Sequence, residues 1–479
     1  MSSDNGGIIG VVNDPTSTVA SGVWQQEEQY EAKVNDTWPQ RALFTTKSLR
    51  FDDGSSDYLN RTPSQEGSRR QLTFSCWFKK GLNAGTWTWL MHSAASNDGT
   101  PSFGVGIKSN ALSVIDLGAD GSYDINFITN RLFRDPSAWY HVVVAIDTTQ
   151  GTESNRVKIY VNGVQETSFS TAVYPSQNHD FNTGPTMTNY ATEIGRDNYN
   201  GGESYFDGYM AEIILVDGSQ LAPTSFGVTN SDGVWTPIIY TGTFGTNGFN
   251  LQFENAAALG TDSSSNGNNF TVNNLTSIDQ STDYPEVNFA TMNPLYRYTN
   301  NMTYSEGNLK VVGGGNSWQG ANSTFYINKG KWFFEVKFAS ATDVGNFYIG
   351  WTTAGDYNIS EPYNNGINYY NSDGGEIYAN GSALTTADYG TFANGDIMGM
   401  ALDYDNSLLT VYKNGSALVT DYDFSSATTT AKGGNLVTPT VAHYGSGTLE
   451  WNFSSPPFAI SSGNTDGNGY GNFEYAVPS

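Results

Sequence analysis

The sequence is poor in positive charge, in cysteine and in long apolar runs. It carries 22 Lys and Arg residues against 47 Asp and Glu residues, which gives a formal net charge of −25 at pH 7. Affinity for nucleic acid depends largely on clustered basic side chains, and an anionic bilayer attracts the same side chains. The charge balance therefore argues against both partners, and we expect the acidic residues to serve solubility.

The single cysteine, Cys76, excludes an intrachain disulfide. It lies in the apolar stretch 73–78, where a lone thiol is typical of a small buried side chain rather than a reactive one. The first residues, Met1 to Asn5, lack the basic and apolar regions of a signal peptide. No stretch reaches the roughly 18 apolar residues of a membrane span. We therefore expect synthesis in a cytoplasm, without membrane insertion.

Aromatic and turn-forming residues are abundant. The chain has 29 Tyr, 26 Phe, 11 Trp and 53 Gly, while only 14% of its 479 residues are charged. Aromatic and β-branched residues favour strands, whereas long helices rely on Ala, Leu, Glu and Lys. A chain of this length also exceeds one ordinary core. The predicted fold class is all-β, with two successive antiparallel β-sandwich (jelly-roll) domains and a short N-terminal helical leader.

Changes of pattern along the chain predict five segments. Ser21 can cap a helix over 22–34, which Trp38-Pro39 terminates. A polar, Gly- and Asn-rich stretch that begins near Gly260 is typical of a connector. The segments are a leading segment over 1–40, a first sandwich over 41–255, a connector over 256–300, a second sandwich over 301–460 and an extended tail over 461–479.

Both strand-rich regions contain the same hairpin pattern. An apolar strand over 142–146 is followed by the alternating strand 157–161 and then by Asn162-Gly163. In the second region, strands near 396–403 and 408–412 lead to Asn414-Gly415. Asn-Gly is the strongest short signal for a tight hairpin, because both residues tolerate positive φ angles.

The first region resembles the laminin-G-like, concanavalin-A-type jelly rolls. The resemblance extends over about 200 residues and rests on an ordered set of stretches: 49–59, 72–78, 139–144, 159–163 and 206–213. The second region resembles a SPRY domain, on the stretches 330–336, 348–351, 395–399, 409–415 and 451–458. Both resemblances imply β-sandwiches. The second also implies a binding module whose strand-joining loops recognise a partner.

The leader from Gly22 to Tyr30, ending at Trp38-Pro39, resembles segments that precede such sandwiches in tailed-phage structural proteins. This resemblance implies a protein located in the virion, either a tail fibre or a capsid fibre. It further implies that residues 1–40 bind other virion proteins and that the sandwiches bind a host-surface glycan or protein. Fibres are commonly trimeric, so we expect a homo-oligomer such as a trimer. The alternatives are a virion-associated polysaccharide-degrading enzyme and a decoration protein that only stabilises the capsid.

Patterns for catalysis are sparse. A retaining glycosidase needs two carboxyl groups about 5–5.5 Å apart, and no Glu in the sequence has an Asp two positions later on the same strand face. The histidines are scattered, without a neighbouring His or Cys at a zinc-ligand spacing: His92, His141, His179 and His443. We therefore expect no catalytic residues and no enzymatic activity, although carboxylates on different strands could still converge.

Calcium is the metal that the sequence would suit, because it takes oxygen ligands from loops. The stretches Asp52–Asp57 and Asp403–Asn406 each cluster such oxygens. We favour the alternative interpretation, a hairpin turn whose Asp side chains bond their own backbone. No cofactor is otherwise expected.

Sugar binding uses aromatic faces beside amide and carboxylate groups, because a ring can stack on the apolar face of a pyranose. Gly and Asn surround the aromatic cluster between 363 and 370, and a second cluster lies at 87–89. Aromatic side chains of β-sandwiches otherwise fill the core. The candidate ligand-binding residues are Tyr363, Tyr369, Tyr370, Trp87 and Trp89.

Overall fold

The computed structural model describes residues 46–82, 87–95, 99–197, 204–297, 302–315, 317–341, 346–353, 366–372, 374–379, 382–385, 387–426 and 436–478. The expected helix over 22–34 and the whole leading segment 1–40 lie outside the described residues. Residues 47–479 form one compact unit. Within the described ranges the only helical pieces are short 3-10 turns, which confirms the all-β fold class: η2 (Glu153–Asn155), η4 (Pro223–Ser225) and η5 (Ser277–Asp279).

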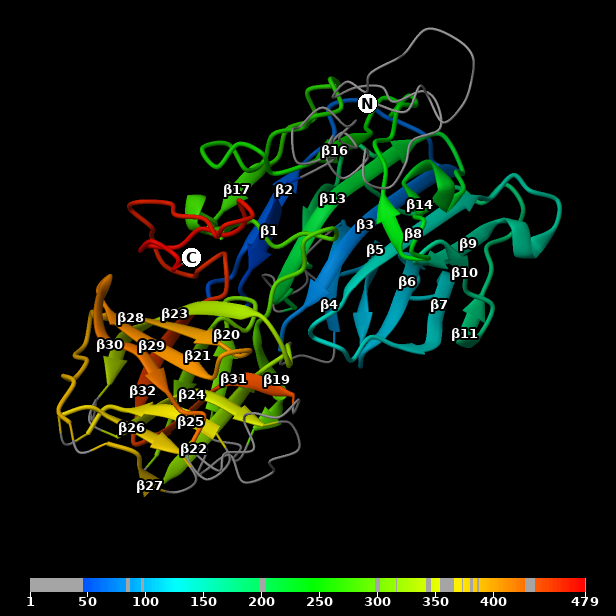
Figure 1. The fold of residues 1–479 in the computed structure, drawn as a ribbon. Helices are drawn as coiled ribbons and strands as arrows, with labels where there is room; N and C mark the ends of the chain where they lie inside the picture. The colour runs from blue at the N-terminus through cyan, green and yellow to red at the C-terminus, as the bar shows by residue number, and fades with distance from the viewer. Residues whose placement is uncertain are drawn as a thin grey trace, which may run out of the picture. The chain divides into compact units, whose positions relative to one another are not determined.

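The first sandwich consists of two antiparallel sheets (Figure 1). One sheet has the strand order β10 (Val164–Gln165), β9 (Val157–Val161), β8 (Trp139–Asp147), β3 (Gln71–Lys80), β13 (Gly208–Asp217), β1 (Ser48–Phe51) and β18 (Gln280–Ser281), and β16 (Phe249–Leu251) pairs with β13. The other has the order β11 (Phe169–Val173), β7 (Tyr123–Leu132), β6 (Ala111–Leu117), β5 (Ser102–Lys108), β4 (Trp87–Ala94), β12 (Ala191–Ile194), β2 (Tyr58–Arg61) and β17 (Thr271–Asn273). A separate hairpin joins β14 (Gly227–Thr229) to β15 (Trp235–Pro237).

The core of the first sandwich explains why β8 is apolar on both faces. Val142, Val144 and Ile146 belong to the main core cluster between the sheets. Val143, on the opposite face, packs in a second cluster that includes Phe226. Successive side chains of a strand point to opposite faces, so a strand covered on both sides needs apolar residues at every position.

The second sandwich also has two antiparallel sheets. The first has the order β19 (Met292–Arg297), β22 (Trp318–Ser323), β31 (Val437–Tyr444), β24 (Phe347–Thr353), β25 (Gly366–Tyr370), β26 (Glu376–Ala379) and β27 (Ser382–Ala383). The second has the order β20 (Met302–Ser305), β21 (Lys310–Gly313), β32 (Gly447–Asn452), β23 (Lys331–Ala341), β28 (Ile397–Asp403), β29 (Leu408–Lys413) and β30 (Ser416–Asp423). Its core includes Phe334, Trp351 and Trp451.

The two predicted Asn-Gly hairpins occupy equivalent positions. Asn162 and Gly163 have φ angles of 47° and 79° and join β9 to β10, and Asn414 and Gly415 have the same two values and join β29 to β30. In each sandwich this hairpin forms the edge of a sheet and is followed inward by β8 and β3, or by β28 and β23. The hairpin pattern that the sequence repeats thus corresponds to one repeated place in the fold.

Arg50 of β1 is a fully buried cation that joins the first sandwich to the second. Its Nε lies 3.1 Å from Oε2 of Glu306 in the second sandwich, and its Nη2 lies 3.4 Å from Oδ1 of Asp279 in the connector. Nη1 donates to the carbonyl oxygen of Pro456 at 3.3 Å. A charge is tolerated in the interior only among charged and polar partners, and these contacts provide them.

A second buried cation, Lys79 of β3, holds the connector. Its Nζ lies 2.7 Å from Oδ2 of Asp283, in an ion pair whose side chains are 1% and 4% exposed. The same Nζ donates to Oδ1 of Asn288 and to the carbonyl oxygen of Phe289. The other carboxylate oxygen of Asp283 accepts a hydrogen bond from Nε1 of Trp139 at 2.9 Å.

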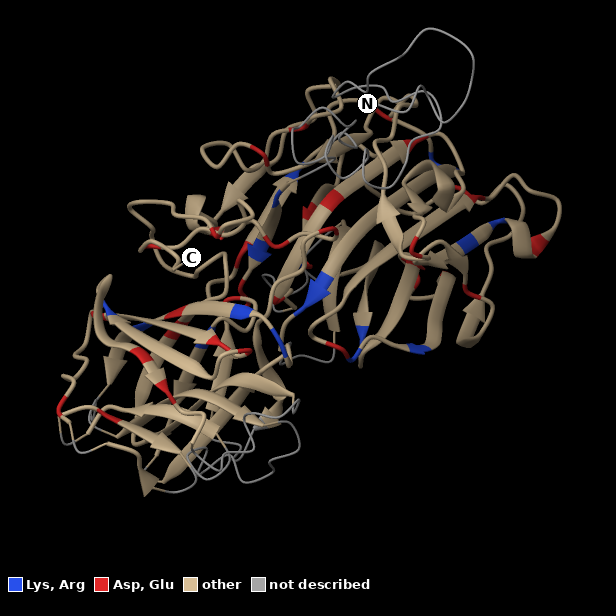
Figure 2. Ribbon diagram, viewed as in Figure 1, with Lys and Arg blue, Asp and Glu red and all other residues tan. Residues whose placement is uncertain are grey.

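Acidic positions are spread over both sandwiches, mostly in loops and at strand ends, and basic positions are fewer (Figure 2). The distribution agrees with the charge balance of the sequence. No helix among the described residues combines the length and the apolar character that a membrane crossing requires.

Candidate functional site

The two predicted tryptophans lie together on β4. The rings of Trp87 and Trp89 stack with centroids 4.9 Å apart, and Nζ of Lys108 lies 4.5 Å from the centroid of the Trp87 ring. Trp89 is only 5% exposed and donates from Nε1 to Oδ2 of Asp197 at 3.1 Å. Its ring covers Gly106 of the neighbouring strand β5, where a Cβ would lie 2.8 Å from the ring. Trp89 therefore offers little surface to a ligand.

The predicted tyrosines are separated by the fold. Tyr363 lies outside the described residues. Tyr369 is fully buried in the core of the second sandwich and donates its hydroxyl to the carbonyl oxygen of Gly390, so its ring is closed to a ligand. Tyr370, the next residue of β25, points to the opposite face of the sheet and is partly exposed.

Tyr370 is part of a row of aromatic side chains on the outward face of this sheet. The row, which we call the aromatic row, has one member on each of five neighbouring strands, β22, β31, β24, β25 and β26. None of its members belongs to the core cluster, whereas the adjacent residues Ile349, Tyr369 and Ile377 do. The members are Trp318, Tyr444, Tyr348, Tyr370 and Tyr378.

Ring contacts make the row continuous. Trp318 lies 5.9 Å from Tyr444 and 5.4 Å from Tyr348, between ring centroids. Tyr348 and Tyr370 stack face to face at 4.1 Å with an interplanar angle of 8°, and Tyr378 meets Tyr370 edge-on at 5.3 Å. Four steps between neighbouring strands of about 4.8 Å give the row a length of about 19 Å.

Polar groups accompany the row. The hydroxyl of Tyr370 donates to Oδ1 of Asn346 at 3.1 Å, and Glu376 is the partner of Tyr370 in the ladder between β25 and β26. Sequence reasoning found only Tyr370 among the five rings. The other members alternate with core residues along their own strands, and this period of two is the only local signal that could have indicated them.

Both predicted calcium stretches use their carboxylates within the protein. Oδ2 of Asp57 accepts the backbone N–H of Asp52, and Oδ2 of Asp52 accepts the hydroxyl of Ser55. In the second stretch, Asp403 accepts both the backbone N–H and the side-chain amide of Asn406. These contacts are those of turns whose Asp side chains bond nearby backbone.

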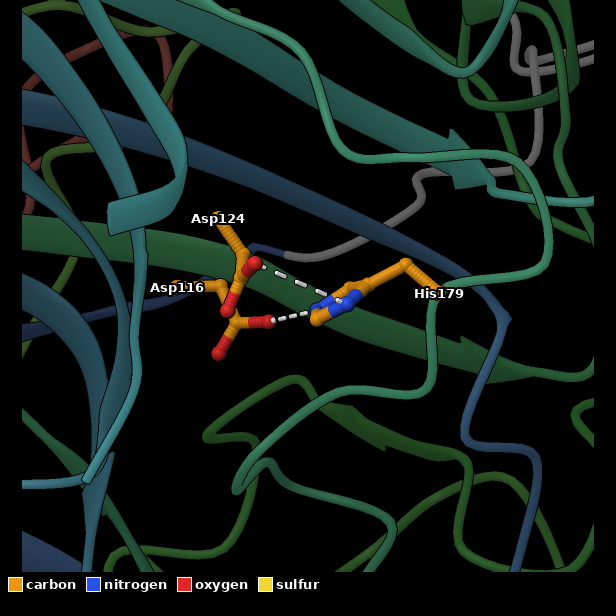
Figure 3. Close-up of side chains that lie close together, drawn as sticks. All are labelled: Asp116, Asp124 and His179. Carbon is orange, nitrogen blue, oxygen red and sulfur yellow. Dashed lines mark hydrogen bonds and ion pairs between the residues drawn. The ribbon is translucent and has the colours of Figure 1, made fainter. Parts of the chain in front are cut away.

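A cluster that the sequence did not indicate brings together Asp116 of β6, Asp124 of β7 and His179, which lies between β11 and β12 (Figure 3). Nε2 of His179 lies 2.7 Å from Oδ2 of Asp116, and Nδ1 lies 3.8 Å from Oδ1 of Asp124. Their ligand atoms lie within 4.8 Å of one another. A metal ion would take one nitrogen of the ring, whereas here each nitrogen faces a different carboxylate, which suits a doubly protonated imidazole.

We expect His179→Gln to lower the free energy of unfolding by about 1–2 kcal/mol at pH 5.5 and by much less at pH 8.5. Burial alone would lower the pKa of His179, but the hydrogen bond to Asp116 and the charges of Asp116 and Asp124 outweigh it and raise the pKa. The stabilisation from the charged ring is therefore complete below the unfolded-state pKa of about 6.5 and is lost as the pH rises through the folded-state value.

Urea denaturation at the two pH values checks this prediction. Glutamine can keep a neutral hydrogen bond to Asp116, so the variant removes the charge of the ring but not the hydrogen bond. The double variant with Asp116→Asn is expected to lose little more stability than the more damaging of the two single variants, because both changes break the same interaction. An equal loss at both pH values would contradict a protonated ring.

A buried Ser–His pair is not arranged for catalysis. Nδ1 of His141 accepts a hydrogen bond from Nε1 of Trp235 at 2.9 Å, so Nε2 carries the ring hydrogen and donates to the hydroxyl oxygen of Ser75 at 2.8 Å. Burial also lowers the pKa of His141 to about 3. A general base must accept the hydroxyl proton of the serine, and this ring nitrogen has no free lone pair for it.

Comparisons with known proteins identify both sandwiches. Residues 53–221 match the family model described as the concanavalin A-like lectin/glucanases superfamily, and residues 331–456 match the SPRY domain model. A search of curated proteins found no match.

Solved structures also match parts of this chain. The SPRY domain of human HERC1 has 14% identity and a TM-score of 0.26, and the match covers 33% of this chain and 96% of that chain. A proposed carbohydrate binding protein from Bacteroides ovatus ATCC 8483 has 18% identity and a TM-score of 0.33, with 48% and 59% covered. A SAP-like pentraxin from Limulus polyphemus has 16% identity and a TM-score of 0.25, with 35% and 79% covered. The family matches place a concanavalin A-like β-sandwich and a SPRY domain, in this order, in one chain.

Proposed function

We propose that this protein binds carbohydrate without chemical conversion, and that the aromatic row is a binding surface. The observation that carries the proposal is the position of five aromatic rings on the outward side of five neighbouring strands. Four of these rings are at least partly exposed, whereas Tyr348 is only 6% exposed and contacts three of the others. Aromatic rings stack on the apolar faces of sugar rings, and the nearby Asn346 and Glu376 supply groups that bond hydroxyls. A row about 19 Å long suits a chain of several sugar units rather than a single one.

We expect Tyr378→Ala and Tyr444→Ala each to weaken binding of the full chain to its polysaccharide by about tenfold, which corresponds to about 1.4 kcal/mol. Tyr444 is 37% exposed and both residues lie toward the ends of the row, so the sandwich should fold without them. Affinity is measured by depletion assays against insoluble polysaccharides and by titration against soluble ones, in a panel of glucans, mannans, galactans and chitin.

The matched control is Tyr123→Ala, which removes a tyrosine of similar exposure to Tyr444 (43%) from the first sandwich and is expected to leave binding unchanged. Unchanged affinity in both row variants would reject the aromatic row as the binding surface. Release of new reducing ends from a bound polysaccharide would instead favour the alternative, a polysaccharide-degrading enzyme.

The setting that we propose is a virion, in which residues 1–40 attach the protein to other virion proteins and several copies bind a host surface together. This proposal rests on the resemblance of the leader 22–39 to segments of tailed-phage structural proteins. Several weak sites on one particle raise the overall affinity, because each further contact becomes intramolecular.

Deletion of residues 1–40 is expected to abolish incorporation into particles while the isolated protein keeps its affinity for polysaccharide. Particle composition after purification measures the first effect, and the depletion assay measures the second. Normal incorporation would reject the anchoring role. A third outcome would favour the decoration protein. In that case incorporation depends on residues 1–40 and particles without the protein are less stable, but the intact protein binds no glycan.

A further inference from the structure

The turn between β20 and β21 has a strained backbone. Its residues Glu306, Gly307 and Asn308 have φ angles of 55°, 60° and 67°. Residues other than glycine are strained in this left-handed region, and they normally enter it singly rather than in succession. Such strain persists only where the surroundings hold the backbone in place. The turn therefore needs partners outside its own hairpin.

The first sandwich supplies these partners. The N–H of Gly307 donates to Oδ1 of Asp207 at 3.2 Å, and its carbonyl oxygen accepts the hydroxyl of Tyr209 at 3.2 Å. Oδ1 of Asn308 accepts the N–H of Leu82 at 3.1 Å. The turn lies so close to Tyr209 that a Cβ at position 307 would stand 2.5 Å from its ring. The turn 306–308, which we call the plug, is thus inserted into the first sandwich.

Glu306 of the plug contacts both a cation and a carboxylate of the first sandwich. Its Oε2 accepts Nε of Arg50 at 3.1 Å, and its backbone N–H donates to Oδ1 of Asp52 at 3.1 Å. The backbone N–H of Asp52 in turn donates to Oδ2 of Asp57 at 3.0 Å. Asp57 is only 3% exposed, and Asp207 is fully buried. Buried carboxyl groups therefore form much of the seat in which the plug lies.

Further charges act on these two buried carboxyl groups. The groups that act on Asp207 are Asp52 and Asp53 from the turn after β1, Glu306 from the plug, Lys80 from the end of β3 and Tyr209 from β13. The groups that act on Asp57 are Asp52, Asp279 and Glu306. Like charges repel strongly in an interior that holds little water. An ionised Asp57 or Asp207 is therefore disfavoured as long as the plug is seated.

The pKa values of both groups are shifted in the corresponding direction. Burial, as the largest cause, raises the pKa of Asp207 well above its usual value, and the charges of Asp53 and Asp52 add to this shift. Burial likewise raises the pKa of Asp57 to about 7. Water at an open junction would return both pKa values toward about 3.9. Protons therefore bind more tightly to the closed junction, so its closure is fully favoured below about pH 4 and is lost as the pH rises to about 7 and beyond.

We propose that the plug and its seat form a proton-controlled joint, which is closed while the carboxyl groups at the junction are protonated and opens when they ionise. In the closed state the two sandwiches keep one orientation. In the open state the second sandwich rotates about the chain that follows Phe289, because Lys79 holds the connector up to that residue on the first sandwich. The proposal goes beyond carbohydrate binding, since it concerns how the two domains are presented rather than which ligand they bind.

Distances between spin labels on the two sandwiches test the joint in the full chain. The labels are attached through Glu153→Cys in η2 and Ala417→Cys in β30, both at exposed positions, with Cys76→Ala to remove the native thiol. We expect one narrow distance distribution at pH 5.5. At pH 9 we expect a second, broad population that is at least ten times as abundant as at pH 5.5. Small-angle scattering of the unaltered chain should show a larger radius of gyration at pH 9.

Asp207→Asn keeps an oxygen that accepts the N–H of Gly307 but cannot ionise, so the labelled variant should stay closed at pH 9. Asp57→Asn should reduce the opening as well, and it serves as the test if the first variant does not fold. The matched control is Asp120→Asn, which changes an exposed carboxyl group in the loop between β6 and β7 and should open as the parent does. Identical distributions at both pH values would overturn the proposal, as would full opening in both Asp207→Asn and Asp57→Asn.

Discussion

Replacement of Arg50 by methionine is expected to lower the free energy of unfolding by about 3–5 kcal/mol. The guanidinium is fully buried, at 3.1 Å from Oε2 of Glu306 and 3.4 Å from Oδ1 of Asp279. Methionine fills much of the volume but leaves both carboxylates without this cation. Uncompensated buried charge is among the largest destabilising effects of a single substitution.

Urea denaturation followed by tryptophan fluorescence measures this loss. The matched control is Arg70→Met, because Arg70 forms an ion pair with Asp180 in which the side chains are 44% and 48% exposed. Such a surface pair contributes about 1 kcal/mol or less. A loss below about 1 kcal/mol in Arg50→Met would mean that the link between the sandwiches is not maintained by this cation.

Replacement of Glu212 by glutamine is expected to raise the free energy of unfolding by about 2–3 kcal/mol at pH 8.5 and to change it little at pH 4. Glu212 lies at a bulge of β13, with a φ of 46°, and is 5% exposed. Burial raises the pKa of its carboxyl group to about 7, although the side-chain hydrogen bond from Gln252 acts in the opposite direction.

The direction of the stability change follows from the difference between the folded-state and the unfolded-state pKa of Glu212. The folded-state pKa lies above the unfolded value of 4.5, so the folded protein prefers the protonated carboxyl group. Stability is therefore lost as the pH rises from about 4.5 to about 7, and the loss remains complete above that range. Glutamine does not ionise and avoids this cost.

Chemical denaturation at pH 4 and pH 8.5 provides the comparison. The matched control is Glu153→Gln, which changes an exposed carboxyl group in η2 and is expected to shift stability by less than about 0.5 kcal/mol at either pH. A gain of equal size at both pH values would show that packing, rather than ionisation, limits stability at this bulge.

The parts of the fold that local patterns determine could be predicted from the sequence. Asn162-Gly163 and Asn414-Gly415 adopt the positive φ angles that a two-residue hairpin needs, so composition at the turn fixed the pairing of the adjacent strands. The apolar residues on both faces of β8 likewise indicated a strand covered on both sides. A strand of two residues, such as β18, is too short to show a period.

The aromatic row could not be predicted from local patterns, because it depends on the register between strands that are far apart in the sequence. Tyr369 and Tyr370 are neighbours in a sequence rich in Gly and Asn, yet one enters the core and the other the aromatic row, because a strand alternates its faces. Trp318 and Tyr444 are 126 positions apart and meet only because β22 pairs with β31. The His179 cluster has the same origin, since its members come from two strands and a distant loop.

The connector also determines where the first sandwich can be separated from the rest of the chain. β17 pairs along β2 and β18 pairs along β1, so this stretch closes one edge of each sheet of the preceding sandwich. A cut at residue 255 would leave those two edges bare, and bare edges invite pairing between molecules. Recombination that exchanges the first sandwich as an intact piece should therefore break the chain after Phe289, beyond these strands and beyond the connector groups that bond the buried Lys79.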